Sequence, residues 1–171
     1  MSQLHMRRAD LQNLPPLELP ESYILREYSK GDESGIAALL QTTFGDVWTS
    51  ERAMEVLIDA DDVKTTFVIE HNGEIVATAS ARLLPQMYPD AGYVHYVAAS
   101  PNHAGKKLGY IVSLATLHEF VRLGCTSAVL DTDDFRLPAV KTYLNLRFVP
   151  HHTDDTHAER WATVQSNLAA R

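Results

Sequence analysis

The sequence predicts a single α/β domain of the α+β kind, with an antiparallel sheet in the N-terminal half followed by alternating helices and strands. Its 171 residues, 45% apolar and 22% charged, are enough to bury the core of one ordinary globular domain. Runs that alternate in polarity or are β-branched are separated by segments whose apolar residues recur at helical spacing. An Asn72-Gly73 pair between two strand-like runs is a strong hairpin signal and predicts antiparallel pairing.

The N-terminal segment, residues 1–22, is expected to form an arm outside the folded domain, which then spans residues 23–171. Pro15, Pro16 and Pro20 exclude a regular helix in this segment. Such an arm either packs loosely or lies over the domain and contacts a partner.

One strand and two helices come first in the expected domain. Residues 23–28 (YILREY) form the strand, and apolar residues at helical spacing follow Asp32, a suitable N-cap. A second short helix covers residues 50–59 and begins at a serine. The expected meander of three antiparallel strands covers residues 65–70, 74–84 and 93–99.

The C-terminal half continues with a glycine-containing loop over residues 100–105 that runs into a long helix over residues 105–123. The many apolar positions of this helix imply burial on most sides, and Gly124 suits its C-terminal end. The remaining elements are a strand over residues 127–132, a helix from Pro138, a strand from Phe148 and a helix over residues 156–168.

The charge of the chain is acidic but unevenly distributed. Fifteen Lys and Arg against 22 Asp and Glu give a net charge of −7, which argues against nucleic acid and anionic membranes as partners. Residues 91–118 contain no Asp or Glu, yet they include Lys106 and Lys107. This acid-free stretch suits the binding of an anion.

No apolar run is long enough to span a membrane, so no membrane segment is expected. Cys125 is the only cysteine, which excludes an intrachain disulfide and suits a reducing compartment. The N-terminus lacks the apolar core of a signal peptide. We therefore expect a cytoplasmic protein.

Two polar clusters are candidate ligand sites. Asp131, Asp133 and Asp134 either bind a cationic substrate or are solvated loop groups, since the residues after them lack the ligand and glycine that a calcium loop needs. The His and Asp residues within residues 151–157 lack the spacing of a metal site, so no metal is expected.

The strand over residues 93–99, the loop after it and the start of the next helix form the segment that indicates chemistry. A helix N-terminus leaves backbone N–H groups unpaired and carries a partial positive charge, and Gly105 and Gly109 let the backbone approach a ligand closely. This arrangement suits a pyrophosphate. The alternative is an ordinary strand–helix turn with lysines on its surface.

The stretch VHYVAASPNHAGKKLGYIV resembles the acetyl-coenzyme A binding segment of the GNAT superfamily of N-acetyltransferases. In that family an apolar strand is followed by Arg/Gln-x-x-Gly-x-Gly/Ala, which opens a helix. Gly109 matches the last position, and Gly105 matches a glycine common in the family. Ala104 replaces the Arg or Gln, and Lys107 replaces the first Gly.

A second stretch, DTDDFRLPAVKTYLNLRFVP, resembles the family pattern N-x-x-A-x-x-x-Y-x-x-x-G-F. Ala139, Tyr143 and Phe148 match it, whereas Arg136 replaces the Asn and Arg147 replaces the Gly. Together the two motifs extend the resemblance over about residues 23–150.

The resemblance implies the GNAT fold, a mixed and mostly antiparallel sheet with helices on both faces, splayed between its fourth and fifth strands. It also implies acetyl-coenzyme A as co-substrate, with the pantetheine paired to backbone near Val97 and Ala99 and with Arg136 near the phosphates or the substrate. The pyrophosphate would lie on the backbone N–H groups of Ala104, Gly105, Lys106, Lys107, Leu108, Gly109 and Tyr110.

The resemblance further implies that Tyr143 is the general acid for the leaving thiolate, although its helical spacing also suits a core residue. His95 is the candidate base, because strand alternation places Tyr93, His95, Val97 and Ala99 on one face and only His95 titrates near pH 7 there. A purely structural histidine is the alternative.

The expected function is therefore transfer of an acetyl group from acetyl-coenzyme A to a primary amine of a small molecule or peptide, by direct attack. The alternative is a catalytically silent GNAT-fold module that binds acyl-coenzyme A as a sensor or assembly partner. Because relatives are often dimers, a homodimer is possible.

Overall fold

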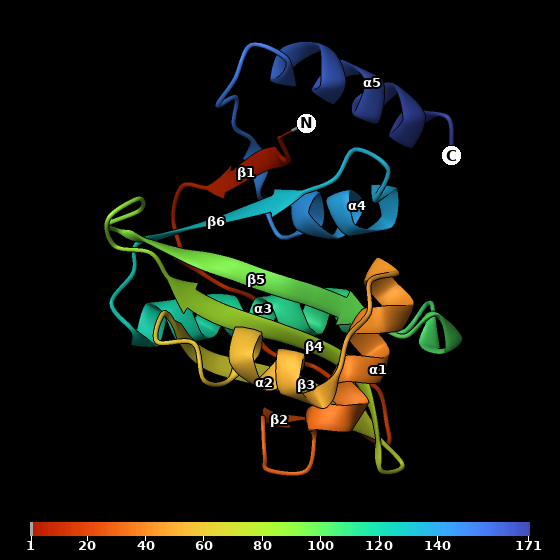
Figure 1. Cartoon of the computed structure of the whole chain (residues 1–171). Helices are drawn as coiled ribbons and strands as arrows, with labels where there is room; N and C mark the ends of the chain where they lie inside the picture. The colour runs from red at the N-terminus through yellow and green to blue at the C-terminus, as the bar shows by residue number, and fades with distance from the viewer. Residues whose placement is uncertain (1) are drawn as a thin grey trace.

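The computed structural model describes residues 2–171, which fold into a seven-stranded sheet with helices on both faces (Figure 1). The strand order is β2-β3-β4-β5-β6-β1-β7. The strands are β1 (Leu4–Arg8), β2 (Tyr23–Glu27), β3 (Val63–His71), β4 (Glu74–Leu83), β5 (Ala91–Ala99), β6 (Ser127–Thr132) and β7 (Val149–Pro150). The helices are α1 (Glu33–Phe44), α2 (Ser50–Leu57), the short 3₁₀-helix η1 (Pro101–His103), α3 (Leu108–Arg122), α4 (Leu137–Asn145) and α5 (His157–Ala169).

Strands β3 to β5 form the predicted antiparallel meander, and β2 extends it by pairing antiparallel with β3. The hairpin between β3 and β4 turns at Asn72 and Gly73, whose φ angles of 50° and 81° are the left-handed values that a type I′ turn requires. The hairpin signal in the sequence is therefore confirmed.

Strands β5 and β6 are parallel but pair over only three residues, ending at Tyr93 opposite Val129. Beyond that pair the two strands diverge, and Figure 1 shows the gap opening toward their carboxyl ends. We call this gap the fork. It is the predicted splay between the fourth and fifth strands of the expected sheet.

The expectation that residues 1–22 form a separate N-terminal arm is wrong for residues 4–8. These form β1, which lies between β6 and β7 and pairs antiparallel with both. Leu4 and Met6 are fully buried. The alternation of apolar and polar residues in this short run is therefore the sequence pattern that corresponds to the strand. Residues 9–22 then cross the α3 side, where the Pro15 carbonyl lies 2.8 Å from His118 Nε2.

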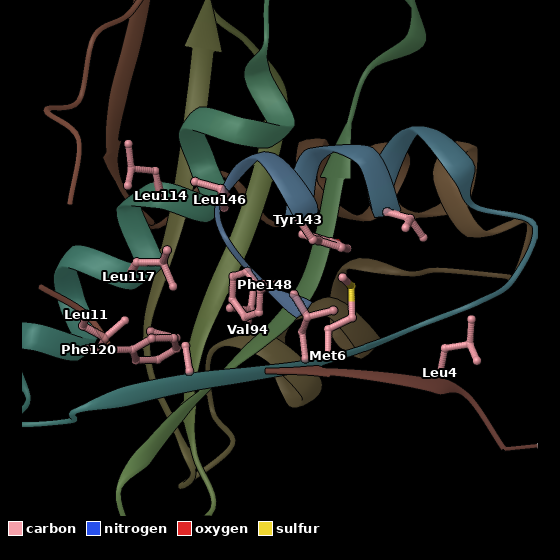
Figure 2. Packing of buried hydrophobic residues seen from close by; sticks show 14 of the residues in the cluster. Leu4, Met6, Leu11, Val94, Leu114, Leu117, Phe120, Tyr143, Leu146 and Phe148 are labelled. Atoms are coloured by element: carbon pink, nitrogen blue, oxygen red, sulfur yellow. The ribbon is translucent and has the colours of Figure 1, made fainter. Parts of the chain in front are cut away.

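Two apolar layers cover the sheet. On one face α1 and α2 pack on β3, β4 and β5, and on the other face lies α3 (Figure 1). The larger cluster joins α3, α4 and α5 to β1 and β6, with side chains such as Met6, Phe120, Leu146 and Phe148 at its centre (Figure 2). Within residues 2–171, no helix is long and apolar enough to cross a membrane.

Candidate active site

The loop between β5 and α3 presents a row of free backbone donors. Gly105 and Lys107 both take left-handed backbone, with φ angles of 82° and 58°. Across residues 2–171, the six consecutive N–H groups from Gly105 to Tyr110 donate to no protein acceptor, and the first intrahelical bond runs from the Ile111 N–H to the Lys107 carbonyl. Successive free N–H groups at a helix start form a concave site for an anion.

Helix α3 begins at Leu108 rather than at residue 105, because Lys107 is its left-handed N-cap. The family motif has glycine at this position, and glycine adopts that conformation without a steric penalty. Lysine pays about 1–2 kcal/mol for it. Lys106 and Lys107 are both exposed and belong to the segment that carries the free donors.

A β-bulge changes which β5 side chains share a face. Ala98 pairs with Thr78 but His95 pairs with Ser80, so β5 holds one residue more than β4 between these pairs, and Tyr96 has a φ of 47°. The extra residue reverses the alternation beyond it.

The predicted common face of Tyr93, His95, Val97 and Ala99 is therefore wrong. Val97 and Ala99 pack on the α3 side, whereas His95 lies on the α1/α2 side, in the cavity described next. Beyond Tyr93, β5 has no β6 partner, so its backbone edge faces the fork.

His95 lines a cavity of about 470 Å³ on the α1/α2 side of the sheet. Burial, together with nearby Arg82, lowers the pKa of His95 to about 4. The imidazole is therefore neutral at pH 7. The other lining residues come from α2, the loop after it, β4 and β5: Glu55, Val56, Ala60, Asp61, Asp62, Arg82 and Tyr96.

Tyr143 extends from α4 into the larger apolar cluster, with its ring centroid 6.2 Å from that of Phe148 (Figure 2). Burial raises the pKa of its phenol. The residue is thus part of the core, as its helical spacing suggested, and it keeps its proton at neutral pH. Its role as general acid stays a prediction.

Arg136 connects two elements across the fork. Its Nε donates to Asp133 Oδ2 at 2.9 Å, its Nη1 donates to the Thr43 carbonyl at 3.3 Å, and its guanidinium stacks on Phe44 at 4.4 Å. These contacts tie the loop after β6 to the end of α1. Contact of Arg136 with a cofactor stays a prediction.

A partly buried polar group beside the fork includes His5, a residue that the sequence did not indicate. His5 Nδ1 lies 2.7 Å from Asp131 Oδ1, and the Tyr93 hydroxyl donates to Asp131 Oδ2 at 2.9 Å. His5 could have been found only by assigning β1 as a strand. Within the described residues 2–171, no group of three or more His, Cys, Asp or Glu side chains is arranged to hold a metal ion.

Comparison with known proteins identifies the family. The chain matches the sequence profile of the Acetyltransferase (GNAT) family over residues 34–148. It is 26% identical over 161 residues to a mycothiol acetyltransferase of Nocardia farcinica, an alignment that covers 87% of this chain and 52% of the relative. It is 28% identical over 170 residues to a mycothiol acetyltransferase of Rhodococcus jostii, covering 91% of this chain and 55% of the relative. The chain thus spans about half the length of these curated relatives.

The fold is also that of solved structures in the family. A GCN5-related N-acetyltransferase from Sphaerobacter thermophilus aligns with a TM-score of 0.68 at 18% identity, over 89% of this chain and 50% of that chain. The profile match covers more than half of the chain and includes both the loop before α3 and the whole of α4. This chain therefore belongs to the acetyltransferase (GNAT) family.

Proposed function

We propose that this chain transfers the acetyl group of acetyl-coenzyme A to a primary amine of a small molecule or peptide. The observation that carries the proposal is the row of six free backbone N–H groups from Gly105 to Tyr110, directly after a strand whose edge faces the fork. Family membership supports an acyl transfer. The relatives named mycothiol acetyltransferase are longer proteins than this chain. The proposal therefore does not specify mycothiol as the acceptor.

The residues present fit a diphosphate followed by an extended chain. The N–H groups from Gly105 to Tyr110 would hold the pyrophosphate. The N–H of Ala104, which the resemblance places in this row, instead donates to the Pro101 carbonyl at 3.3 Å. The exposed ammonium groups of Lys106 and Lys107 would add attraction in place of the Arg or Gln of the family motif. The free edge of β5 near Val97 and Ala99 would pair with the amides of the pantetheine.

The bound thioester supplies the acetyl group. As the new N–C bond forms, the C–S bond breaks, the amine loses a proton and the thiolate gains one. His95 is neutral in its cavity and accepts the proton of the amine, directly or through water. Tyr143 is protonated at neutral pH, burial raises the pKa of its phenol further, and in this proposal it protonates the thiolate.

Two measurements test the proposal. Calorimetric titration with acetyl-coenzyme A should show binding below about 1 mM, the upper range of common KM values. A panel of primary amines should then release the coenzyme A thiol at a rate that depends on the amine. No heat at millimolar ligand would overturn the proposal.

A silent acyl-coenzyme A sensor is the second candidate, and the deep burial of Tyr143 in the core favours it. A sensor would bind acetyl-coenzyme A in the calorimeter but would release no thiol with any amine in the panel. The same two measurements therefore separate the enzyme from the sensor.

A further inference from the structure

Asp131 lies at the fork, two residues beyond the last pair between β5 and β6. Ala128 and Leu130 point into the larger apolar cluster, so Asp131 points to the opposite face of the sheet, as expected from strand alternation. The hydroxyl of Tyr93, the last paired residue of β5, reaches across to Asp131 Oδ2 at 2.9 Å. The carboxylate is thereby held where the two strands separate.

The other support of Asp131 comes from the N-terminal strand. His5 of β1 lies opposite Asp131 in the antiparallel register, and its Nδ1 is 2.7 Å from Asp131 Oδ1. The side chain of His5 is only 4% exposed, whereas that of Asp131 is 28% exposed. Each carboxylate oxygen has one protein partner, and a carboxylate accepts about four hydrogen bonds in all. Asp131 therefore keeps free acceptor capacity on a surface that a ligand can reach.

Asp131 differs from the two carboxylates that follow it in the sequence. Asp133 is paired with Arg136 at 2.9 Å, and Asp134 is paired with Arg160 through a bidentate contact. Within residues 2–171, no Lys or Arg forms an ion pair with Asp131. Of the three, it is the carboxylate whose charge no arginine or lysine neutralises.

Aromatic rings pack on the two residues that hold this carboxylate. Tyr88 stacks on His5 with a centroid distance of 5.7 Å and on Tyr93 at 6.3 Å. His151 lies 5.3 Å from His5 on the other side. A carboxylate next to aromatic rings matches an alkylammonium group, which donates a charged hydrogen bond to the carboxylate and makes cation–π contact with a ring.

We propose that Asp131 binds the ammonium group of a cationic primary amine, the acetyl acceptor, with His5 and Tyr93 as positioning residues. The assignment of this ligand as the acceptor rests on the proposed function. Alkylamines are mostly protonated at pH 7, so this is the form in which the acceptor arrives. Before attack the ammonium releases one proton to solvent. His95, whose ring centroid is 6.0 Å from that of Tyr93, is the neighbouring imidazole that takes the second proton as the N–C bond forms.

The test uses 2-phenylethylamine, a cation at pH 7, and the neutral arylamine 4-ethylaniline as probes of the full chain. Binding is followed by NMR through the His5 and Tyr93 ring signals. D131N removes the charge at constant size and should weaken 2-phenylethylamine binding by about tenfold to a hundredfold, as expected for a hydrogen bond to a charged group. Binding of 4-ethylaniline should change by less than twofold. The matched control D155N alters an exposed carboxylate and should leave both unchanged.

A second variant, Y93F, keeps the ring and removes only the hydroxyl that holds Asp131. Like D131N, it should weaken the binding of 2-phenylethylamine. Its affinity for acetyl-coenzyme A should stay within twofold of the wild-type value. Equal 2-phenylethylamine binding by D131N and wild type, or an equal loss for both probes, would overturn the assignment. Binding at this site without thiol release would instead overturn the proposed function, so the two failures are distinguishable.

Discussion

Burial penalises the charged form of both Tyr143 and His95, so it raises the pKa of the phenol further above 7 and, together with Arg82, lowers that of the imidazole to about 4. Burial has opposite chemical consequences for the two side chains. A buried phenol holds its proton and can donate it, whereas a buried imidazole is left with a free lone pair and can accept one. The pKa of the proposed base therefore depends strongly on its surroundings, whereas the proposed acid is protonated at pH 7 even at its ordinary pKa.

Substitution of Tyr143 by Phe should lower kcat by about 10²–10⁴-fold, the usual contribution of a general acid. Acetyl-coenzyme A affinity in the calorimeter should stay within twofold, because the ring that packs against Phe148 is retained. Tyr28→Phe, in the separate α1/α2 cluster, is the matched control. An unchanged kcat would assign Tyr143 to the core alone.

The pKa of His95 predicts a pH dependence of stability. Its folded-state pKa of about 4 lies below the unfolded value of about 6.5, so the neutral form is favoured by folding. This stability is fully present above about pH 6.5 and is lost as the pH falls toward 4, by at most about 1.4 kcal/mol per pH unit. Urea unfolding from pH 7 to 4 should show a shallower loss for His95→Gln than for wild type.

The control for His95 is His152→Gln, which changes an exposed histidine and should follow the wild-type curve. Parallel curves for His95→Gln and wild type would contradict the buried neutral imidazole. The same pKa means that a flat rate profile between pH 5 and 8 is compatible with His95 as the base, because its titration lies below that range.

At the scale of elements, features set by the local sequence could be predicted, whereas features imposed by the surrounding fold could not. Asn72-Gly73 sets its own turn, so the hairpin was predictable from two residues. The bulge at Tyr96 and the left-handed Lys107 are not local preferences of Tyr or Lys, and the surrounding fold imposes them. The predicted face of His95, Val97 and Ala99 failed for this reason.

The contact between β5 and α3 depends on a glycine that no motif indicated. A Cβ atom at position 92 would lie 2.1 Å from Cδ1 of Phe120, whose side chain is fully buried. Gly92→Ala should therefore cost about 1–3 kcal/mol through overpacking, measured as the free energy of unfolding in urea. Gly109→Ala is the control, because its Cβ would meet nothing closer than the Ala99 Cβ at 3.9 Å. Equal stability of the two variants would contradict the tight packing.

Across the whole molecule, the two ends of the chain complete one edge of the sheet. Strand β1 is paired on one side with β6 and on the other with β7, and the His151 N–H donates to the His5 carbonyl at 2.9 Å. The family match begins only at residue 34, so neither the motifs nor the resemblance pointed to β1. Leu4 and Met6 form a short apolar pattern, which can be interpreted as a buried strand only when β6 and β7 are known to lie beside it.

Because β1 joins the two sides of this edge, a core substitution within it should destabilise the whole fold. Met6 is fully buried in the larger cluster, among residues of β6, α4 and α5 (Figure 2). Met6→Ala should cost about 2–5 kcal/mol in the free energy of unfolding, in a single cooperative transition. Leu17→Ala, in the exposed part of the same segment, should cost less than about 1 kcal/mol. If residues 1–22 were a dispensable arm, the two substitutions would have equally small effects, and thermal or urea unfolding would separate these outcomes.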